Sequence, residues 1–397
     1  LASASVANAG ITWDAGEWTV DMNGNVNAFA VFSSSDNSSG PVGGLAAVQT
    51  ADDADKDSMA IQTGLLPSWL GFTATTRQND LDTSITISFQ PGTGGNSALS
   101  GGASNSTGTE NRQAFLTFGD KSWGSVKVGK DLGIFASTAI LNDMTLLGVG
   151  GTGGTAGNNA AATNAKGTTT TLGGIGTGYL YADWKGQIAY TTPNMNGLSA
   201  TLGVTQPWNS DTSSGTTDTV AFEAQVAYSW TGDFAGKVWG GAFSQDVTGI
   251  DNGAGGTTDS DATAFEVGVS TSIYNINLVA YGYSGEGVGT TGMLVQGFDA
   301  NGSKRDSDGG YVQATYVIPM GTKLGVSYGV SKLDDNAVDA GGNLVKENNR
   351  VTVGAYHPLT KHLNLVAEYS HVESESHDAG AVTSEQDIMS VGAILFF

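Results

Sequence analysis

Hydrophobic and polar residues alternate with a period of two along much of this chain. In residues 17–32, EWTVDMNGNVNAFAVF, the even positions are mainly apolar, and the odd positions are polar as far as Asn27. A helical period does not separate these two sets, whereas a strand places them on opposite faces. The same alternation recurs at 84–89, 198–204, 220–230, 324–331 and 363–370. The pattern predicts β-strands that each have one apolar and one polar face.

The connections between these predicted strands fall into two length classes. The short connections lie at 78–80, 120–124, 192–197, 231–236, 274–275, 319–322 and 358–361. The long ones, rich in Gly, Ser, Thr, Asn and Asp, lie at 34–68, 91–110, 132–179, 206–218, 246–262, 285–308, 333–347 and 374–384. Short turns that alternate with long loops are typical of outer-membrane barrels, and the spacing predicts about sixteen strands.

A single closed barrel explains this pattern better than a soluble β-sandwich. Sandwich domains usually have about 100 residues and seven to nine strands, whereas this chain has 397 residues and no obvious linker or internal repeat. In lipid every backbone polar group needs a partner, so the sheet has to close. A barrel of about sixteen strands leaves an aqueous channel. We therefore predict one all-β domain, residues 10–397, a 16-stranded antiparallel transmembrane β-barrel with a polar lumen.

Composition excludes several other classes of protein. The 38 acidic residues outnumber the 16 Lys and Arg, and the formal net charge is −22. Nucleic acid is therefore a poor partner, because phosphate binding needs clustered bases. The chain has no cysteine, which excludes disulfides and thiolate chemistry. No apolar run is long enough for a membrane-spanning helix.

The first residues, LASASVANAG, are mostly small. Ala7-Asn8-Ala9 has the form of a signal-peptidase site. Residues 1–9 are accordingly interpreted as a signal-peptide remnant or a flexible N-terminal arm. The first interpretation implies export through a cleaved signal peptide.

The connection at 132–179 differs from the other long loops. Its first half, IFASTAILNDMTLLGVG, is apolar and can form a short helix, and the rest is low-complexity Gly, Thr, Ala and Asn. An apolar loop of this length exposed to water would be unusual. Folding inward against the barrel wall would bury the apolar half.

The order NRQAFLTFGDKSWGSVKVGKD, then this loop, then GQIAYTTPNMNGLSATLG, resembles the Gram-negative general porin family. The resemblance extends from the first strand to the terminal Phe. It implies a homotrimeric outer-membrane channel whose third loop narrows the lumen and which admits small hydrophilic solutes passively. The PEFGG motif that enterobacterial members carry in this loop is missing.

The resemblance and the strand alternation together identify candidate pore-lining and constriction residues. Arg112 and Lys130 match positions of wall bases in the family, and Asp143 is the main candidate carboxylate of the loop, with Asp131 at its base. Alternation, or proximity to a short turn, adds Arg77, Lys127, Asp183 and Lys185. The alternative for each residue is a hydrated lumen side chain without effect on transport.

The chain ends in SVGAILFF, in which Phe397, Leu395 and Val391 share the apolar face. A terminal aromatic residue resembles the signal that the barrel assembly machinery reads in outer-membrane proteins. It also lets the last strand pair with the first, which leaves no open edge. We therefore interpret these residues as a C-terminal assembly signal.

The sequence contains no recognisable nucleophile–base pair, and it carries neither a G-x-S-x-G elbow nor a P-loop. The four histidines lack metal-site spacing. Acidic loop residues such as Asp53, Asp55 and Asp57 could hold Ca²⁺, or they form a solvated acidic rim. We therefore predict no enzyme activity and no cofactor other than loop-bound divalent cations.

These observations predict a porin in the outer membrane of a Gram-negative bacterium. Its partners would be lipid, lipopolysaccharide, the assembly machinery and small hydrophilic solutes. The net charge predicts a preference for cations, because charged rings and walls bias permeation. Two alternatives stay open at this point: a channel selective for a sugar, peptide or organic anion, and an acidic β-rich structural or adhesive surface protein.

Overall fold

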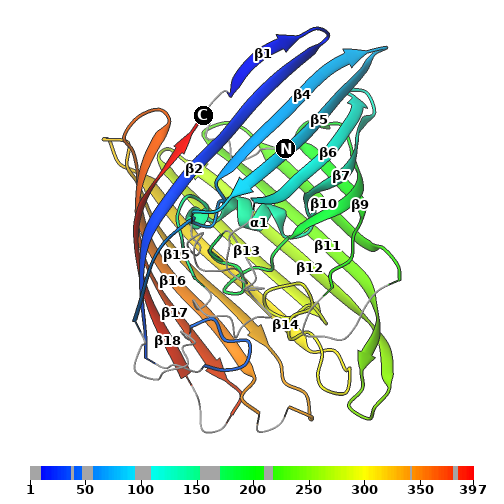
Figure 1. Ribbon diagram of the computed structural model, residues 1–397, viewed down its shortest axis with the longest axis vertical. Coiled ribbons are helices and arrows are strands. Elements are labelled where there is room, and N and C mark those ends of the chain that lie inside the picture. Colours follow the sequence, from blue (N-terminus) through cyan, green and yellow to red (C-terminus); the bar gives the residue numbers. More distant parts are fainter. Residues whose placement is uncertain are drawn as a thin grey trace, which may run out of the picture.

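The computed structural model describes residues 10–36, 40–46, 57–93, 109–152, 170–209, 218–339, 342–378 and 383–397. Most of these residues belong to one antiparallel sheet that curls into a barrel (Figure 1). The signal-peptidase pattern at 7–9 and two of the calcium candidates, Asp53 and Asp55, lie outside the described residues. Within the described part of the chain, no helix is long and apolar enough to cross a bilayer.

The sheet contains 18 strands. They are β1 (Ile11–Ala15), β2 (Trp18–Ser35), β3 (Asp57–Gln62), β4 (Trp69–Gln78), β5 (Leu81–Pro91), β6 (Thr109–Asp120), β7 (Gly124–Leu132), β8 (Trp184–Thr191), β9 (Leu198–Thr205), β10 (Ala221–Trp230), β11 (Phe234–Asp251), β12 (Thr257–Ile273), β13 (Ile276–Glu286), β14 (Asp306–Val317), β15 (Lys323–Leu333), β16 (Val345–Pro358), β17 (Leu363–Ser376) and β18 (Thr383–Phe396).

These 18 strands occupy 16 positions around the barrel. Along one edge of β2, residues 18–22 pair with β1 and residues 25–35 pair with β18. Along its other edge, residues 19–25 pair with β4 and residues 29–34 pair with β3. Because β1 shares a position with β18, and β3 with β4, the prediction of a 16-stranded barrel is confirmed.

The barrel closes where β18 meets β2. Phe396 pairs with Asn25, and Phe397 and Gly24 exchange two backbone hydrogen bonds of 2.9 and 3.0 Å. Leu395 lies on the outer face, where 43% of its surface is exposed, whereas Ile394 is buried inside. The last strand therefore continues the outward apolar stripe of the other strands.

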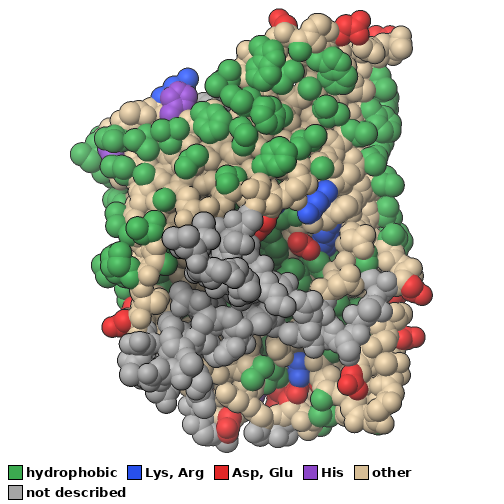
Figure 2. Space-filling model, in the orientation of Figure 1, with side chains coloured by type: hydrophobic (Ala, Val, Ile, Leu, Met, Phe, Trp, Pro, Cys, Tyr) green, Lys and Arg blue, Asp and Glu red, His purple; other side chains and the backbone are tan. Residues whose placement is uncertain are grey.

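The wall has the two faces that the alternation predicts. On β12, Phe265 and Val267 are exposed on the outside, whereas Ala264 and Glu266 are buried on the inside. Figure 2 shows hydrophobic side chains spread over the outer surface, with acidic side chains mostly toward its two ends. An apolar outer band with charged ends suits a barrel that sits in a bilayer.

The two ends of the barrel differ in their connections. At the end drawn uppermost in Figure 1, tight turns join neighbouring strands. Asn79 and Asp80 make the β4–β5 turn with φ of 50° and 60°. Asn and Asp tolerate this left-handed region, and the resulting turn matches the twist of the strands. We call this end the short-turn end and the opposite end the long-loop end.

Candidate functional site

The described part of the chain between β7 and β8 folds into the barrel, as predicted. We call its residues, 133–152 and 170–182, the inward segment. It carries α1 (Ser137–Asn142) and a 3₁₀ turn, η1 (Met144–Leu147), and α1 lies within the outline of the barrel (Figure 1). Phe135, just before α1, packs in the same cluster as Trp239 of the inner wall. The apolar half of the loop is thus buried against the wall rather than exposed to water.

Two wall carboxylates bind the start of the inward segment. Glu223 on β10 accepts hydrogen bonds from the backbone N–H groups of Ile134 and Phe135, at 2.7 and 2.9 Å. Glu266 on β12 accepts one from the N–H of Ala136 at 3.1 Å. A carboxylate that accepts backbone N–H groups makes strong, charge-assisted bonds. These bonds fix the segment where it leaves the wall.

The middle of the segment is bound in the same way on the far side of the barrel. Glu368 on β17 accepts hydrogen bonds from the N–H groups of Val149 and Gly150, at 2.7 and 2.9 Å, and from the hydroxyl of Tyr356 at 2.6 Å. Between these anchors, Gln313 on β14 accepts a hydrogen bond from the N–H of Met144 at 2.6 Å. The inward segment therefore crosses the lumen from β10 to β17 and is tied to the wall along its course.

Asp143, the main candidate carboxylate of the loop, lies between α1 and η1. Its side chain accepts a hydrogen bond from the N–H of Thr145 at 2.9 Å, which caps η1. It also accepts one from the hydroxyl of Tyr179 at 2.8 Å. Burial raises the pKa of Tyr179 well above its ordinary value, so this hydroxyl keeps its proton. Arg350 of β16 lies 3.7 Å away, so the wall base that faces Asp143 is Arg350.

Lys127 and Asp131 share the inner face of β7. Lys127 forms an ion pair with Asp131, and its ammonium group lies 5.0 Å from the ring of Phe115. Gln113 donates a second hydrogen bond to Asp131, at 3.0 Å. The two charges are paired in this sector of the inner wall, so they present little net field to the lumen.

Lys185 lies on the inner face of β8 but is covered. Only 2% of its side chain is exposed, and it forms an ion pair of 2.5 Å with Glu223. Its ammonium group lies 4.0 Å from the ring of Trp208. Lys185 thus holds the carboxylate that binds the inward segment, and it is not a free charge of the pore.

Two of the predicted residues, Arg112 and Asp183, lie at the junction between the segment and the wall. Arg112 is buried, forms an ion pair of 2.6 Å with Glu110 and lies over the ring of Trp184 at 5.8 Å. Asp183 accepts a hydrogen bond from the N–H of Trp184 at 2.7 Å, and burial raises the pKa of its carboxyl group.

Lys130 differs from the prediction. It pairs directly with Ala114 and Gly186, which lie on the outer face together with the exposed Ile188. Because side chains alternate along a strand, Lys127 and Lys130 point to opposite sides of β7. Lys130 is therefore an outer-wall residue and does not line the pore.

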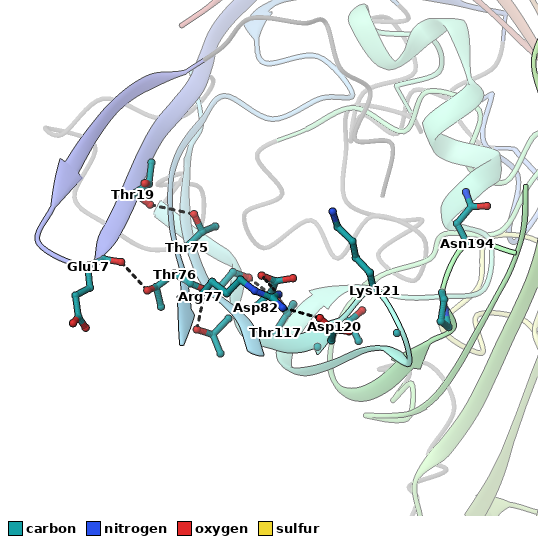
Figure 3. Close-up of a pocket in the computed structure, with 16 residues that line it drawn as sticks. Glu17, Thr19, Thr75, Thr76, Arg77, Asp82, Thr117, Asp120, Lys121 and Asn194 are labelled. Atoms are coloured by element: carbon teal, nitrogen blue, oxygen red, sulfur yellow. Dashed lines mark hydrogen bonds and ion pairs between the residues drawn. The ribbon is translucent and has the colours of Figure 1, made fainter. Parts of the chain in front are cut away.

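Arg77 lies at the short-turn end, where the wall is hollowed by a cavity of about 890 Å³ (Figure 3). Its guanidinium group contacts Asp82 at 2.7 Å and Asp120 at 3.0 Å. Hydroxyl groups, among them those of Thr75 and Thr117, line the same cavity. This mouth is hydrophilic, and its principal base is neutralised by carboxylates.

Two inner-wall lysines have no ion pair among the described residues. Lys237 of β11 lies 3.5 Å from the hydroxyl of Thr138 in α1, and Lys323 of β15 lies 4.5 Å from the ring centre of Tyr356. The wall carboxylates Glu266 and Glu368 are already bound to the inward segment.

Of the calcium candidates, Asp57 is exposed at the start of β3, and no group of three metal-ligating side chains occurs in the described ranges.

The anchoring residues Glu223, Glu266, Glu368 and Gln313 were not singled out from the sequence. Each is one polar side chain on the polar face of a strand. The sequence pattern of such a residue is the same whether its side chain lines the lumen or binds the inward segment. Alternation shows that such residues point inward, and only the position of the inward segment shows what they bind.

A closed 16-stranded barrel with an apolar exterior and an inward loop defines an outer-membrane channel. The model of the Gram-negative porin family matches residues 1–377, and the chain belongs to this family. It lies in the outer membrane.

Solved structures with the same fold share little sequence with this chain. The outer-membrane channel DcaP of Acinetobacter baumannii is 15% identical, with a TM-score of 0.68, over 98% of this chain and 100% of that one. OmpF of Salmonella typhi, in complex with daunomycin, is 15% identical, with a TM-score of 0.62, over 98% and 100%. OmpT of Vibrio cholerae is 16% identical, with a TM-score of 0.58, over 98% and 100%. A comparison with curated proteins finds no match.

Proposed function

We propose that this porin forms a water-filled channel for the passive diffusion of small hydrophilic solutes and ions. The observation that carries the proposal is the inward segment, bound by Glu223, Glu266 and Glu368 to the inner face of a barrel wide enough to hold water. Such a segment narrows the lumen without closing it. No chemical step is assigned to any residue.

We further propose that the channel prefers cations. The chain carries a formal net charge of −22, and Figure 2 shows acidic side chains toward both ends of the visible face. Acids at a mouth raise the local concentration of cations. Lys237 and Lys323 act against this preference from inside. Reversal potentials of the purified protein across a KCl gradient test the proposal. A reversal potential whose sign shows that chloride permeates more readily than potassium would overturn it.

A second proposal concerns assembly. A second solved structure of OmpT from Vibrio cholerae is described as a trimer form, and its match with this chain covers 100% of that OmpT chain. We propose that this chain also assembles as a homotrimer within a membrane that contains lipopolysaccharide. The mass of the detergent-solubilised protein tests this, and a monomer mass at all concentrations would contradict it.

A further inference from the structure

The connection between β13 and β14 is a second segment that folds into the barrel. We call residues 287–304 the lid segment. Val288, Leu294 and Phe298 from this segment are buried in one cluster with Ala262 and Ala264, which face inward from β12. The sequence predicts only a long polar loop here. The structure instead places the segment against the inner wall at the long-loop end.

The lid segment contacts the inward segment directly. The N–H of Tyr181 donates a hydrogen bond of 2.9 Å to the carbonyl oxygen of Thr291. A methyl group added at Gly292 would meet the backbone of Tyr181 at 3.2 Å and the ring of Trp208 at 3.6 Å. The two segments thus pack against each other, so a solute that enters from the long-loop end passes the lid segment before the constriction.

One buried arginine holds the lid segment in this position. Arg305, which directly follows the segment, donates hydrogen bonds to the carbonyl oxygens of Gln296 and Phe298, at 3.0 and 2.5 Å. The same guanidinium group binds Asp339 of the next loop through two parallel bonds of 2.8 and 2.7 Å. A bidentate guanidinium–carboxylate pair fixes orientation as well as distance.

A second contact joins the same two loops. Asn336 donates hydrogen bonds to the carboxylate of Asp299 at 3.2 Å and to the carbonyl oxygen of Lys304 at 3.1 Å. The N–H of Asn336 also contacts Asp339 at 3.1 Å. The fold of the lid segment therefore depends on the loop between β15 and β16, through Arg305 and Asp339.

We propose that the lid segment is a second constriction of the channel, and that Arg305 and Asp339 are its positioning residues. This inference rests on the proposed channel function and deepens it. Breaking the Arg305–Asp339 pair frees the segment to leave the lumen. The passage at the long-loop end then widens, and larger solutes enter.

The test uses single-channel conductance and liposome swelling with neutral sugars of increasing size. Arg305→Gln should raise conductance roughly 1.5-fold and shift the size cut-off upward, because pore width controls flux. Arg305→Lys keeps the charge without the bidentate geometry and should give an intermediate value. Lys346→Gln, which breaks an exposed ion pair with Glu375, is the matched control and should behave as wild type.

The absence of cysteine allows a second arm. Tyr181→Cys with Thr291→Cys places two thiols at positions joined by a backbone hydrogen bond, so that a disulfide between them would tie the lid segment to the inward segment. Oxidation should return the conductance of an Arg305→Gln channel to the wild-type value, and reduction should raise it again.

A further variant covers the case in which Arg305→Gln leaves the lid segment in place. Replacing residues 289–296 by two glycines removes most of the lid segment. If this variant keeps its heat-modifiable mobility and still has the wild-type conductance and size cut-off, the inference is overturned. A wild-type protein without conductance would instead overturn the proposed function.

Discussion

The Oδ2 atom of Asp143, on the inward segment, lies 3.7 Å from Nη2 of Arg350 on the wall, and both side chains are buried. Arg350 also donates a hydrogen bond of 2.8 Å to Thr352. This contact joins the tip of the segment to β16, between the anchors at Glu266 and Glu368. Arg350, the arginine of this pair, was not among the predicted site residues.

Replacing Arg350 by Gln should loosen the inward segment. Removal of one partner leaves the buried carboxylate of Asp143 without its cation. For a well-buried pair this lowers the free energy of unfolding by about 3–5 kcal/mol. We expect a lower midpoint of heat-induced unfolding on gels and more frequent flicker of the open-channel current. Lys346→Gln serves as the exposed-pair control, because such pairs contribute about 0–1 kcal/mol. Equal midpoints for the two variants would contradict the assignment.

Neutralising Lys237 should strengthen the preference for cations. Its ammonium group faces the lumen beside Thr138 and has no ion pair within the described structure. Lys237→Gln removes a positive charge from the pore, and the ratio of potassium to chloride permeability should rise by roughly 1.5-fold. High salt should reduce the difference, because mobile ions screen the charge of the lysine more strongly as the ionic strength rises. An unchanged reversal potential at low salt would show that this lysine does not face the conducting path.

The lid segment should respond to pH only in strong acid. Hydrogen bonds from Arg305 hold the pKa of Asp339 below its ordinary value of about 3.9. A carboxyl group with a lowered pKa stabilises the fold above the ordinary value, and this contribution is lost as the pH falls through the lowered value. Conductance should therefore be constant between neutral pH and about pH 5, and should rise only below about pH 3.9.

Asp339→Asn provides the control for this pH dependence. The variant lacks the titrating group, so its conductance should already be raised at neutral pH and should change little in acid. A wild-type rise near neutral pH would assign the response to another group and contradict this prediction.

A side chain at Gly24 should disrupt the closure of the barrel. A Cβ atom there would lie 2.2 Å from the carbonyl oxygen of Trp69 and 2.8 Å from the ring of Phe397. Gly24→Val should therefore destabilise the seam by about 1–3 kcal/mol, the usual effect of overpacking. The yield of heat-modifiable barrel measures this.

Gly186→Val is the matched control for the seam. Gly186 lies on the outer face of β8, and the nearest atom to an added Cβ is 4.0 Å away. This variant should assemble like wild type. Equal yields of the two valine variants would contradict the importance of the close approach at Gly24.

Alternation of period two was enough to predict the strands, the closed barrel and the two faces of its wall. It works because each strand meets lipid on one side and polar groups on the other. The apolar composition of IFASTAILNDMTLLGVG likewise predicted an inward loop, since burial is favourable for those side chains.

Individual roles were harder to predict, and the reason is geometric. Lys127 and Lys130 are three residues apart, so only one of them can face the lumen; alternation predicted Lys127 and the family resemblance implied Lys130. Lys185 was expected to line the pore, and its pairing with Glu223 depends on a contact between strands that no local pattern records. The lid segment was missed because its buried contacts join residues far apart in the sequence.

Diffusion through the purified wild-type protein tests the central claim most directly. The protein is reconstituted into liposomes, and swelling is followed for neutral sugars of increasing size. We expect unsaturable uptake whose rate falls steeply with solute size, together with stepwise conductance in planar bilayers. Uptake that saturates for one solute class would contradict general diffusion, and liposomes that stay impermeable to every small sugar would contradict the channel itself.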